Sequence, residues 1–367
     1  MIPIRVCTLF MIIDRYLIRE VVQPLLAICT ALLATFITFS LSRFLVDADA
    51  GLLQPIEVAQ LTVLKSLISL DVLLPLSLYL AVMTGLGRLY TDSEIYAMRA
   101  GGISEIRLLR PIMRLTFTVA ILVALLSGWV RPWAYTQSYL IKARAEASAE
   151  TSRIRPARFY TFGESKRTVF IEHIAENGSD LEGIFIRTRK ENDLQVITAS
   201  SGIFNYLAKP MFHSLQLADA QVFKKVRDGT DFSAQFDSFT LWLPVQTPQD
   251  PGYKVKSAAT GSLKASPDPE ERAEFQWRLS TPVSALLLAL AAIPLSRSRP
   301  RQGRYAKMLV ALGIYAVYFN LLDVSRSWVE QGSLSFIWWV PGLLGLLVAG
   351  LYLPVIRRKK RLQHAHD

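Results

Sequence analysis

The apolar segments of this chain form two groups of three, and the polar stretch 132–273 separates the groups. A membrane-spanning helix needs about 20 mostly apolar residues, and six segments meet that requirement. They are Val21–Ser42, Ser66–Gly87 and Ile112–Val130 before the polar stretch, and Phe275–Leu295, Met308–Ser327 and Phe336–Ile356 after it. The pattern predicts a polytopic α-helical membrane protein with six transmembrane helices and a domain inserted between helices 3 and 4.

The composition excludes several function classes. Of the 367 residues, 51% are hydrophobic and 19% are charged, below the charged fraction of about 25% that is usual in soluble domains. Cys7 and Cys29 both precede the polar stretch or lie in the first span, so neither can crosslink it. The chain has no phosphate-loop motif, no nucleophile motif and no metal spacing beyond His364 and His366. We therefore expect no catalytic residues, metal or cofactor, and ATP hydrolysis, if used, in a partner.

The distribution of basic residues predicts the topology, because short loops rich in Lys and Arg stay in the cytoplasm. The basic residues outside the polar stretch gather in segments 1–20, 88–110, 297–307 and 357–361, whereas the opposing short loops contain only Arg43. Both termini are expected in the cytoplasm, with residues 132–273 outside. The net charge of +11 is then mostly an orientation signal and a contact with anionic lipid, which argues against nucleic acid as a partner.

Tryptophan agrees with this topology, because indole rings collect at membrane interfaces. Six of the seven tryptophans lie near the predicted outer ends of spans: Trp129, Trp133, Trp277, Trp328, Trp338 and Trp339.

The polar stretch begins as a helix and continues as strands. Residues 132–150 are rich in Ala and are expected to extend the third span. Alternating segments then follow at Arg158–Phe162, Thr168–His173, Leu181–Arg187, Leu194–Ser200, Ser214–Phe223 and Phe232–Leu243. Turn-forming residues separate them, at 163–165, 176–178, 191–193, 201–202 and 227–229. This spacing predicts a β-sandwich or jelly roll, either independent or paired with a partner through its edge strands. Residues 245–269 are expected to be a poorly ordered linker.

A short cytoplasmic helix is expected within Arg88–Ser104. Asp92 or Ser93 can cap its N-terminus, and Gly101-Gly102 can end it. Its apolar face permits two interpretations: a turn lying on lipid, or a coupling helix that docks into a cytoplasmic motor through Glu94. The candidate coupling residues are Asp92, Glu94, Tyr96 and Met98.

Basic residues near the outer ends of the spans are candidate ligands for the phosphate or carboxylate groups of an amphiphile. They are Arg43, Lys65, Arg131 and Arg326. Lys65 could instead place its charge at the interface, and Asp323 could neutralise Arg326. Asp71 lies six residues after Lys65, which is not a helical ion-pair spacing. In the last span, Gly342, Gly345 and Ala349 are expected to permit close helix packing.

The chain resembles the lipopolysaccharide-export permease family, LptF/LptG. The resemblance rests on MIIDRYLIRE (11–20), LPLSLYLAVMTGLGRLYTDSEIYAMRAGGIS (74–104) and FQWRLSTPVSALLLALAAIPLSRSRPRQGRYAKM (275–308). PRQGRYAK and RYLIRE are more similar to the LptF branch.

This resemblance implies an inner-membrane ABC transporter subunit that pairs with an LptG-like six-span subunit. The expected partners are an LptB-like cytoplasmic ATPase dimer, an LptC-like periplasmic jelly-roll protein and lipopolysaccharide. Glu94 matches the family glutamate that contacts the ATPase, and Arg43, Lys65 and Arg131 are plausible counterparts of its lipid-phosphate contacts. The implied domains are 1–131 with the coupling helix near 91–101, the periplasmic jelly roll 132–273, the second helix group 274–356 and the tail 357–367. An alternative is a non-transporting mechanotransmission or scaffold subunit, which would need no lipid cavity.

Overall fold

The computed structural model describes residues 3–49, 52–152, 156–162, 167–175, 179–190, 193–209, 212–226, 230–244, 250–297 and 304–363. The chain divides into two compact units. The helical unit comprises Met1–Leu41, Thr62–Ser138 and Tyr253–Asp367, and the sheet unit comprises Ser42–Leu61 and Tyr139–Gly252.

Long helices make up most of the chain. They are α1 (Pro3–Asp49), α2 (Pro55–Thr91), α4 (Glu105–Leu125), α5 (Arg131–Ser152), α7 (Pro269–Ser296), α8 (Arg304–Glu330) and α9 (Trp339–Gln363). The helices α3 (Glu94–Ala100) and α6 (Thr260–Leu263) are short, and a π-helical turn, Leu126–Val130, joins α4 to α5. The predicted extension of the third span is therefore confirmed.

In the described residues, five helices are long and apolar enough to cross a membrane. They contain the first five predicted spans. The sixth predicted span falls in α9, whose apolar part within the residues searched, Trp339–Tyr352, is shorter than a span.

Helix α7 lies at the centre of the helical core, where it packs against α4, α8 and α9. Small residues line most of its buried surface. These residues are Ala273, Ser280, Thr281, Ser284, Ala285, Ala289, Ala291 and Ala292. Small side chains let helix backbones approach closely. The sequence placed that role in α9, but a Cβ atom added at Gly342 or Gly345 would meet no atom within 4 Å. Among the described residues, α7 rather than α9 therefore has the small side chains that permit close packing within this chain.

Five charged side chains form a buried ion cluster, which we define as Asp71, Arg131, Glu274, Arg278 and Arg326. Glu274 of α7 is fully buried, and its two carboxylate oxygens accept hydrogen bonds from Arg278 at 3.0 Å and Arg326 at 3.0 Å. Arg131 donates to Asp71 at 2.8 Å and lies 3.5 Å from Glu274. The cluster therefore joins α2, α5, α7 and α8.

Two sequence expectations fail at this cluster. Arg326 pairs with Glu330 at 2.8 Å and with Glu274, rather than with Asp323. Trp277 is buried instead of lying at an interface, and the guanidinium carbons of Arg131 and Arg326 lie 5.9 Å and 5.1 Å from its ring centroid. Cation–π attraction of this kind is strongest where the groups are desolvated, so the Trp277 ring helps to stabilise Arg131 and Arg326 in the cluster.

The segment that precedes α7 is docked onto the helical unit. Arg278 donates to the carbonyl oxygens of Lys256 at 3.1 Å and Ala258 at 2.9 Å, and to the hydroxyl of Thr260 at 2.8 Å. That hydroxyl donates in turn to the carbonyl of Gly128 in the π-helical turn. The expectation of a poorly ordered linker is therefore wrong for this segment, because a buried arginine satisfies its carbonyl groups.

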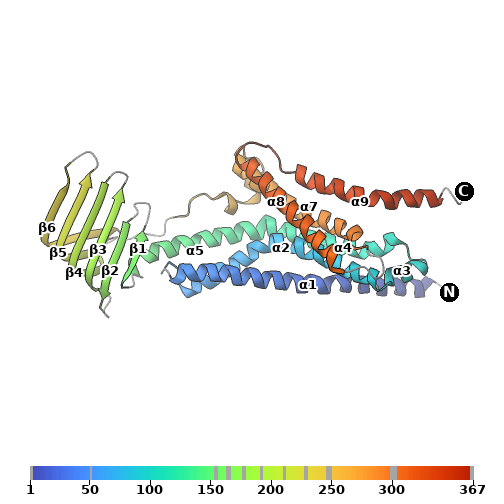
Figure 1. The fold of residues 1–367 in the computed structure, drawn as a ribbon, viewed down its shortest axis with the longest axis horizontal. Coiled ribbons are helices and arrows are strands. Elements are labelled where there is room, and N and C mark those ends of the chain that lie inside the picture. The colour runs from blue at the N-terminus through green and yellow to red at the C-terminus, as the bar shows by residue number, and fades with distance from the viewer. Residues whose placement is uncertain are drawn as a thin grey trace. The chain divides into compact units, whose positions relative to one another are not determined.

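The sheet unit contains one antiparallel sheet whose described strands follow sequence order from β1 to β6 (Figure 1). Its strands are β1 (Arg158–Phe162), β2 (Arg167–Ile174), β3 (Asp180–Lys190), β4 (Asp193–Lys209), β5 (Phe212–Val226) and β6 (Phe232–Pro244). All six predicted strands are confirmed. The turn expected at residues 201–202 is wrong, because β4 continues through it. A Cβ atom on Gly202 would lie 2.6 Å from Ile184 Cδ1, so this glycine serves close packing within the sheet. The turns at 163–165, 176–178 and 227–229, and residues 191–192, lie outside the described residues.

The sheet carries a crease across its strands. The pairing leaves out one row without a change of register, at Glu172, Gly183, Ser200, Asp219 and Asp237, and between β4 and β5 it also leaves out the neighbouring pair of Ala199 and Ala220. Gly183 and Asp219 in this row have positive φ angles of 63° and 51°. The buried positions change parity there, from Leu215 and Leu217 to Ala220 and Val222 in β5. A single six-stranded meander can therefore bury apolar side chains from both halves of its strands in one core. The pairing of the described strands does not show the two sheets of a jelly roll.

We predict that Glu274→Gln destabilises the helical unit by about 3–5 kcal/mol, because it leaves buried arginines without their shared carboxylate. The matched control is Glu330→Gln, whose side chain is 37% exposed and whose loss should cost less than about 1 kcal/mol. Thermal unfolding of the purified full-length chain in detergent measures both. Equal shifts for the two variants would contradict a central role for Glu274.

Candidate functional site

The short helix predicted within Arg88–Ser104 is present as α3, between the end of α2 and the start of α4. Ser93 precedes it in the left-handed region (φ 61°), and Gly102 follows it with φ 85°. These two residues turn the chain on either side of a helix of only seven residues. Helix α1 begins and α9 ends at the end of the helical unit where α3 lies (Figure 1).

The four candidate coupling residues differ in their exposure. Met98 is partly buried and packs against the helical core, as does the buried Ile95. Asp92 is exposed, and Tyr96 is 42% exposed with its ring edge-to-face against Tyr90. The apolar side of α3 therefore anchors the helix to the bundle, and the polar side is available to a partner.

Glu94 is held by α1. Its Oε2 atom accepts a hydrogen bond from the hydroxyl of Tyr16 at 2.8 Å. One turn further along α1, Glu20 pairs with Arg88 of α2 at 2.9 Å, and Arg88 lies 3.6 Å from Asp92. We call Tyr16, Glu20, Arg88, Asp92 and Glu94 the clasp, because they connect α1 to α3 and to the end of α2.

The four candidate lipid-binding residues lie in different surroundings, although Lys65 and Arg131 both lie over the Tyr135 ring, with Arg131 5.8 Å from its centroid. Arg131 and Arg326 belong to the buried ion cluster, where carboxylates already occupy their guanidinium groups. The Lys65 ammonium lies 5.4 Å from the centroid of the Tyr135 ring. Arg43 is exposed on the part of α1 that belongs to the sheet unit. A ring of four free cations is therefore not what the described residues form.

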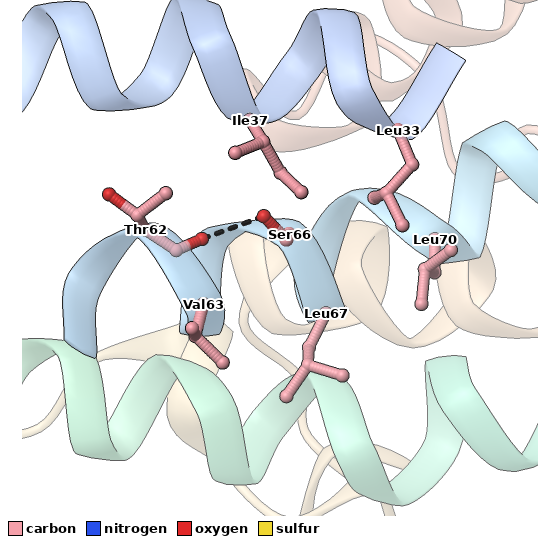
Figure 2. A pocket seen from close by; sticks show the side chains of 7 residues that line it. All are labelled: Leu33, Ile37, Thr62, Val63, Ser66, Leu67 and Leu70. Atoms are coloured by element: carbon pink, nitrogen blue, oxygen red, sulfur yellow. Dashed lines mark hydrogen bonds between the residues drawn. The ribbon is translucent and has the colours of Figure 1, made fainter. Parts of the chain in front are cut away.

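An apolar groove lies between α1 and α2 in the helical unit. Its volume is about 240 Å³, and its lining residues are Leu33, Ile37, Thr62, Val63, Ser66, Leu67 and Leu70. Figure 2 shows Leu33 and Ile37 pointing from α1 toward α2. The hydroxyl of Ser66 donates to the carbonyl of Thr62 at 2.7 Å, so the polar atom is satisfied within α2. Such a lining suits a hydrocarbon chain rather than a polar ligand.

Sequence reasoning missed the partners of the residues that it selected. Glu274 and Arg278 have the i,i+4 spacing of a helical ion pair, which was a usable signal at the start of a predicted span. Tyr16 and Glu94 lie 78 residues apart, and no pattern in a single sequence could pair them. Among the described residues, no group of three or more His, Cys, Asp or Glu could hold a metal ion.

Comparison with known proteins places the chain in one family. The profile of the lipopolysaccharide export system permease LptF/LptG matches residues 15–354. The chain is 30% identical over 361 residues to the lipopolysaccharide export system permease protein LptF of Escherichia coli strain K12, and the match covers 92% of this chain and 93% of the relative. The same values hold for the proteins of that name from Escherichia coli O157:H7 and Shigella flexneri. The chain therefore belongs to the LptF/LptG family of lipopolysaccharide export permeases.

Proposed function

We propose that this chain is the LptF-type membrane subunit of an ABC transporter that extracts lipopolysaccharide from the periplasmic leaflet of the inner membrane. It spans the membrane six times, with both termini in the cytoplasm, and pairs with an LptG-like subunit. Its sheet unit serves as the periplasmic domain that passes the lipid to an LptC-like protein and onward to a bridge. The whole-chain family match supports this assignment.

The apolar groove is the observation that favours lipid transport over a pure relay. Exposing an acyl chain to water costs about 0.8 kcal/mol for each CH₂ group, so a subunit that extracts a lipid must offer apolar surface in exchange. A scaffold or mechanotransmission subunit needs only a closely packed bundle. The groove between α1 and α2 is lined mainly by Leu, Ile and Val side chains, which supports the transporter.

In this proposal, movement driven by ATP hydrolysis reaches the membrane-spanning helices through α3. An LptB-like ATPase dimer binds the exposed side of α3, where Asp92, Glu94 and Tyr96 are accessible, and Met98 holds the helix to the bundle. A carboxylate such as Glu94 suits a basic partner. ATP hydrolysis takes place in that separate subunit, and movement of α3 drives the lipid out of the cavity between the two permease subunits.

The candidate lipid contacts divide into two roles. We assign direct contact with lipid phosphates to Arg43 and Lys65, which lie outside the buried ion cluster. Arg131 and Arg326 hold the bundle together, because their side chains are engaged by Asp71, Glu274 and Glu330.

We predict that Glu94→Ala weakens co-purification of the ATPase and lowers lipid-stimulated ATP hydrolysis. The physical reason is the loss of the carboxylate that a basic partner would bind. The matched control is Asp14→Ala, which removes an acid of α1 that lies 3.5 Å from Arg114. Unchanged assembly and unchanged stimulation in the Glu94 variant would refute the coupling role.

We predict that the double variant Arg43→Ala, Lys65→Ala reduces the lipopolysaccharide that co-purifies with the complex, while the melting temperature of the chain changes little. Arg131→Ala should instead lower the melting temperature, because it leaves the buried Asp71 without its arginine. Mass analysis of bound lipid and thermal unfolding separate the two effects. A double variant that retains all its lipid would contradict the assignment.

A further inference from the structure

The outward face of α4 carries a row of exposed side chains along most of the helix. Positions three or four residues apart lie on one face of a helix. We define the α4 stripe as the exposed residues Arg107, Arg110, Arg114, Phe117, Ile121 and Leu125. The opposite face of α4 is buried in the helical core through Leu108, Ile112, Val119 and Val123.

Side-chain chemistry changes along the α4 stripe in the order of the layers of a membrane. The arginines come first, and Phe117, Ile121 and Leu125 follow with exposed fractions of 59%, 47% and 44%. Trp129, which is 70% exposed, comes one turn later in the π-helical turn. Basic groups suit lipid headgroups, apolar side chains suit the hydrocarbon layer, and indole rings suit the interface.

The length of the helix agrees with this order. At 1.5 Å per residue, Arg110 and Trp129 are separated by about 28 Å along the helix, close to the hydrocarbon thickness of about 30 Å. When Trp129 lies at one membrane interface, Arg110 therefore lies at the headgroup level of the other leaflet.

The large side chains of the α4 stripe favour lipid over a second helix as its occupant. Membrane helices approach one another mainly where small residues line the contact. The stripe instead presents Phe117, Ile121 and Leu125. Acyl chains are flexible and can follow an uneven apolar surface of this kind.

The arginines of the stripe can accept a phosphate group. Residues 107–130 contain no acidic residue. Asp14 of α1 lies 3.5 Å from Arg114, but the Arg114 side chain is 64% exposed and that of Asp14 is 31% exposed. Ion pairs that face solvent in this way are weak, whereas guanidinium groups bind phosphate oxygens through paired hydrogen bonds. A phosphate can therefore displace Asp14 from Arg114.

We propose that the α4 stripe binds one anionic glycerophospholipid of the cytoplasmic leaflet. The lipid phosphate lies at Arg110 and Arg114, Arg107 contacts the rest of the headgroup, and the acyl chains lie along Phe117 and Ile121. The choice of leaflet rests on the topology in the proposed function, but the lipid site depends on this chain alone. This lipid is distinct from the exported lipopolysaccharide, which the proposed function places in the opposite leaflet.

The same arginines also fit an orientation signal. Such a signal needs only an excess of basic residues on one side of the membrane, whereas a lipid site also needs them on one face of one helix. The experiment therefore compares arginines of the α4 stripe with other exposed arginines of the helical unit.

The test is lipid binding by the purified full-length chain, freed of lipid in detergent and titrated with phosphatidylglycerol. Native mass spectrometry counts the bound lipids and gives an apparent Kd for the first of them. Phosphatidylcholine with the same acyl chains should bind roughly tenfold more weakly or worse, because its headgroup has no net charge. Equal binding of the two lipids would overturn the proposal.

The double variant Arg110→Gln, Arg114→Gln should weaken phosphatidylglycerol binding by roughly 25-fold, since each arginine near an anionic headgroup contributes roughly fivefold. The matched control is Arg15→Gln, Arg19→Gln, which removes two exposed arginines of α1. The control should change the affinity by less than about threefold. Equal losses in the two double variants would show that net charge alone attracts the lipid, and would overturn the site.

The apolar part of the site is tested with short-chain phosphatidylglycerol, which keeps the headgroup. It should bind much more weakly than the long-chain lipid, because each CH₂ group removed from water contributes to binding. Glycerol phosphate should not compete with the long-chain lipid at similar concentrations. Effective competition by glycerol phosphate would indicate a site for anions rather than for lipid, and would overturn the proposal.

An acidic surface of the ATPase is the alternative partner for the arginines. Loss of the ATPase from the complex of the Arg110, Arg114 variant, with unchanged phosphatidylglycerol binding, would overturn the lipid site in favour of that contact. Lipid binding is measured on the isolated chain. A native complex without an ATPase would therefore refute the proposed function, and the titration would still decide the lipid site.

Discussion

The fully buried carboxylate of Glu274 is the constraint on which the helical unit depends. Burying a charge is costly unless partners neutralise it, and Glu274 takes its partners from α5, α7 and α8. Arg131 in turn reaches Asp71 of α2, and Arg278 reaches the segment that precedes α7. Glu274 and Asp71 thus connect four helices through shared arginines, and Arg278 connects them to the segment that precedes α7.

Helix α1 is not among the helices that this cluster joins. The cluster gives α2, α5, α7 and α8 a common frame, and α1 packs through Leu17, Val21 and Leu25 near one end and through Phe44, beside Leu61 of α2, near the other. The groove lies at the boundary between this frame and α1, since one wall belongs to α1 and the other to α2.

Sequence patterns predicted elements well because spans and strands report on local periodicity. The five described spans and all six strands lie where hydropathy and alternation placed them. The predictions failed where a residue's role depends on a distant partner. Gly202 was expected in a turn but packs against Ile184 inside the sheet, and Trp277 was expected at an interface but lies buried beside two arginines. For Arg131 and Arg326, the sequence shows the positive charge but not the carboxylates of Asp71, Glu274 and Glu330 that pair with it.

The most direct test of the account is to purify this chain in mild detergent with its native membrane partners and to identify by mass spectrometry the proteins and lipids that accompany it. Recovery of an ATPase, a second six-span subunit and lipopolysaccharide is the predicted result. An ATPase without lipid would contradict the transport claim and favour a relay, and recovery of neither would contradict the assignment as an export subunit.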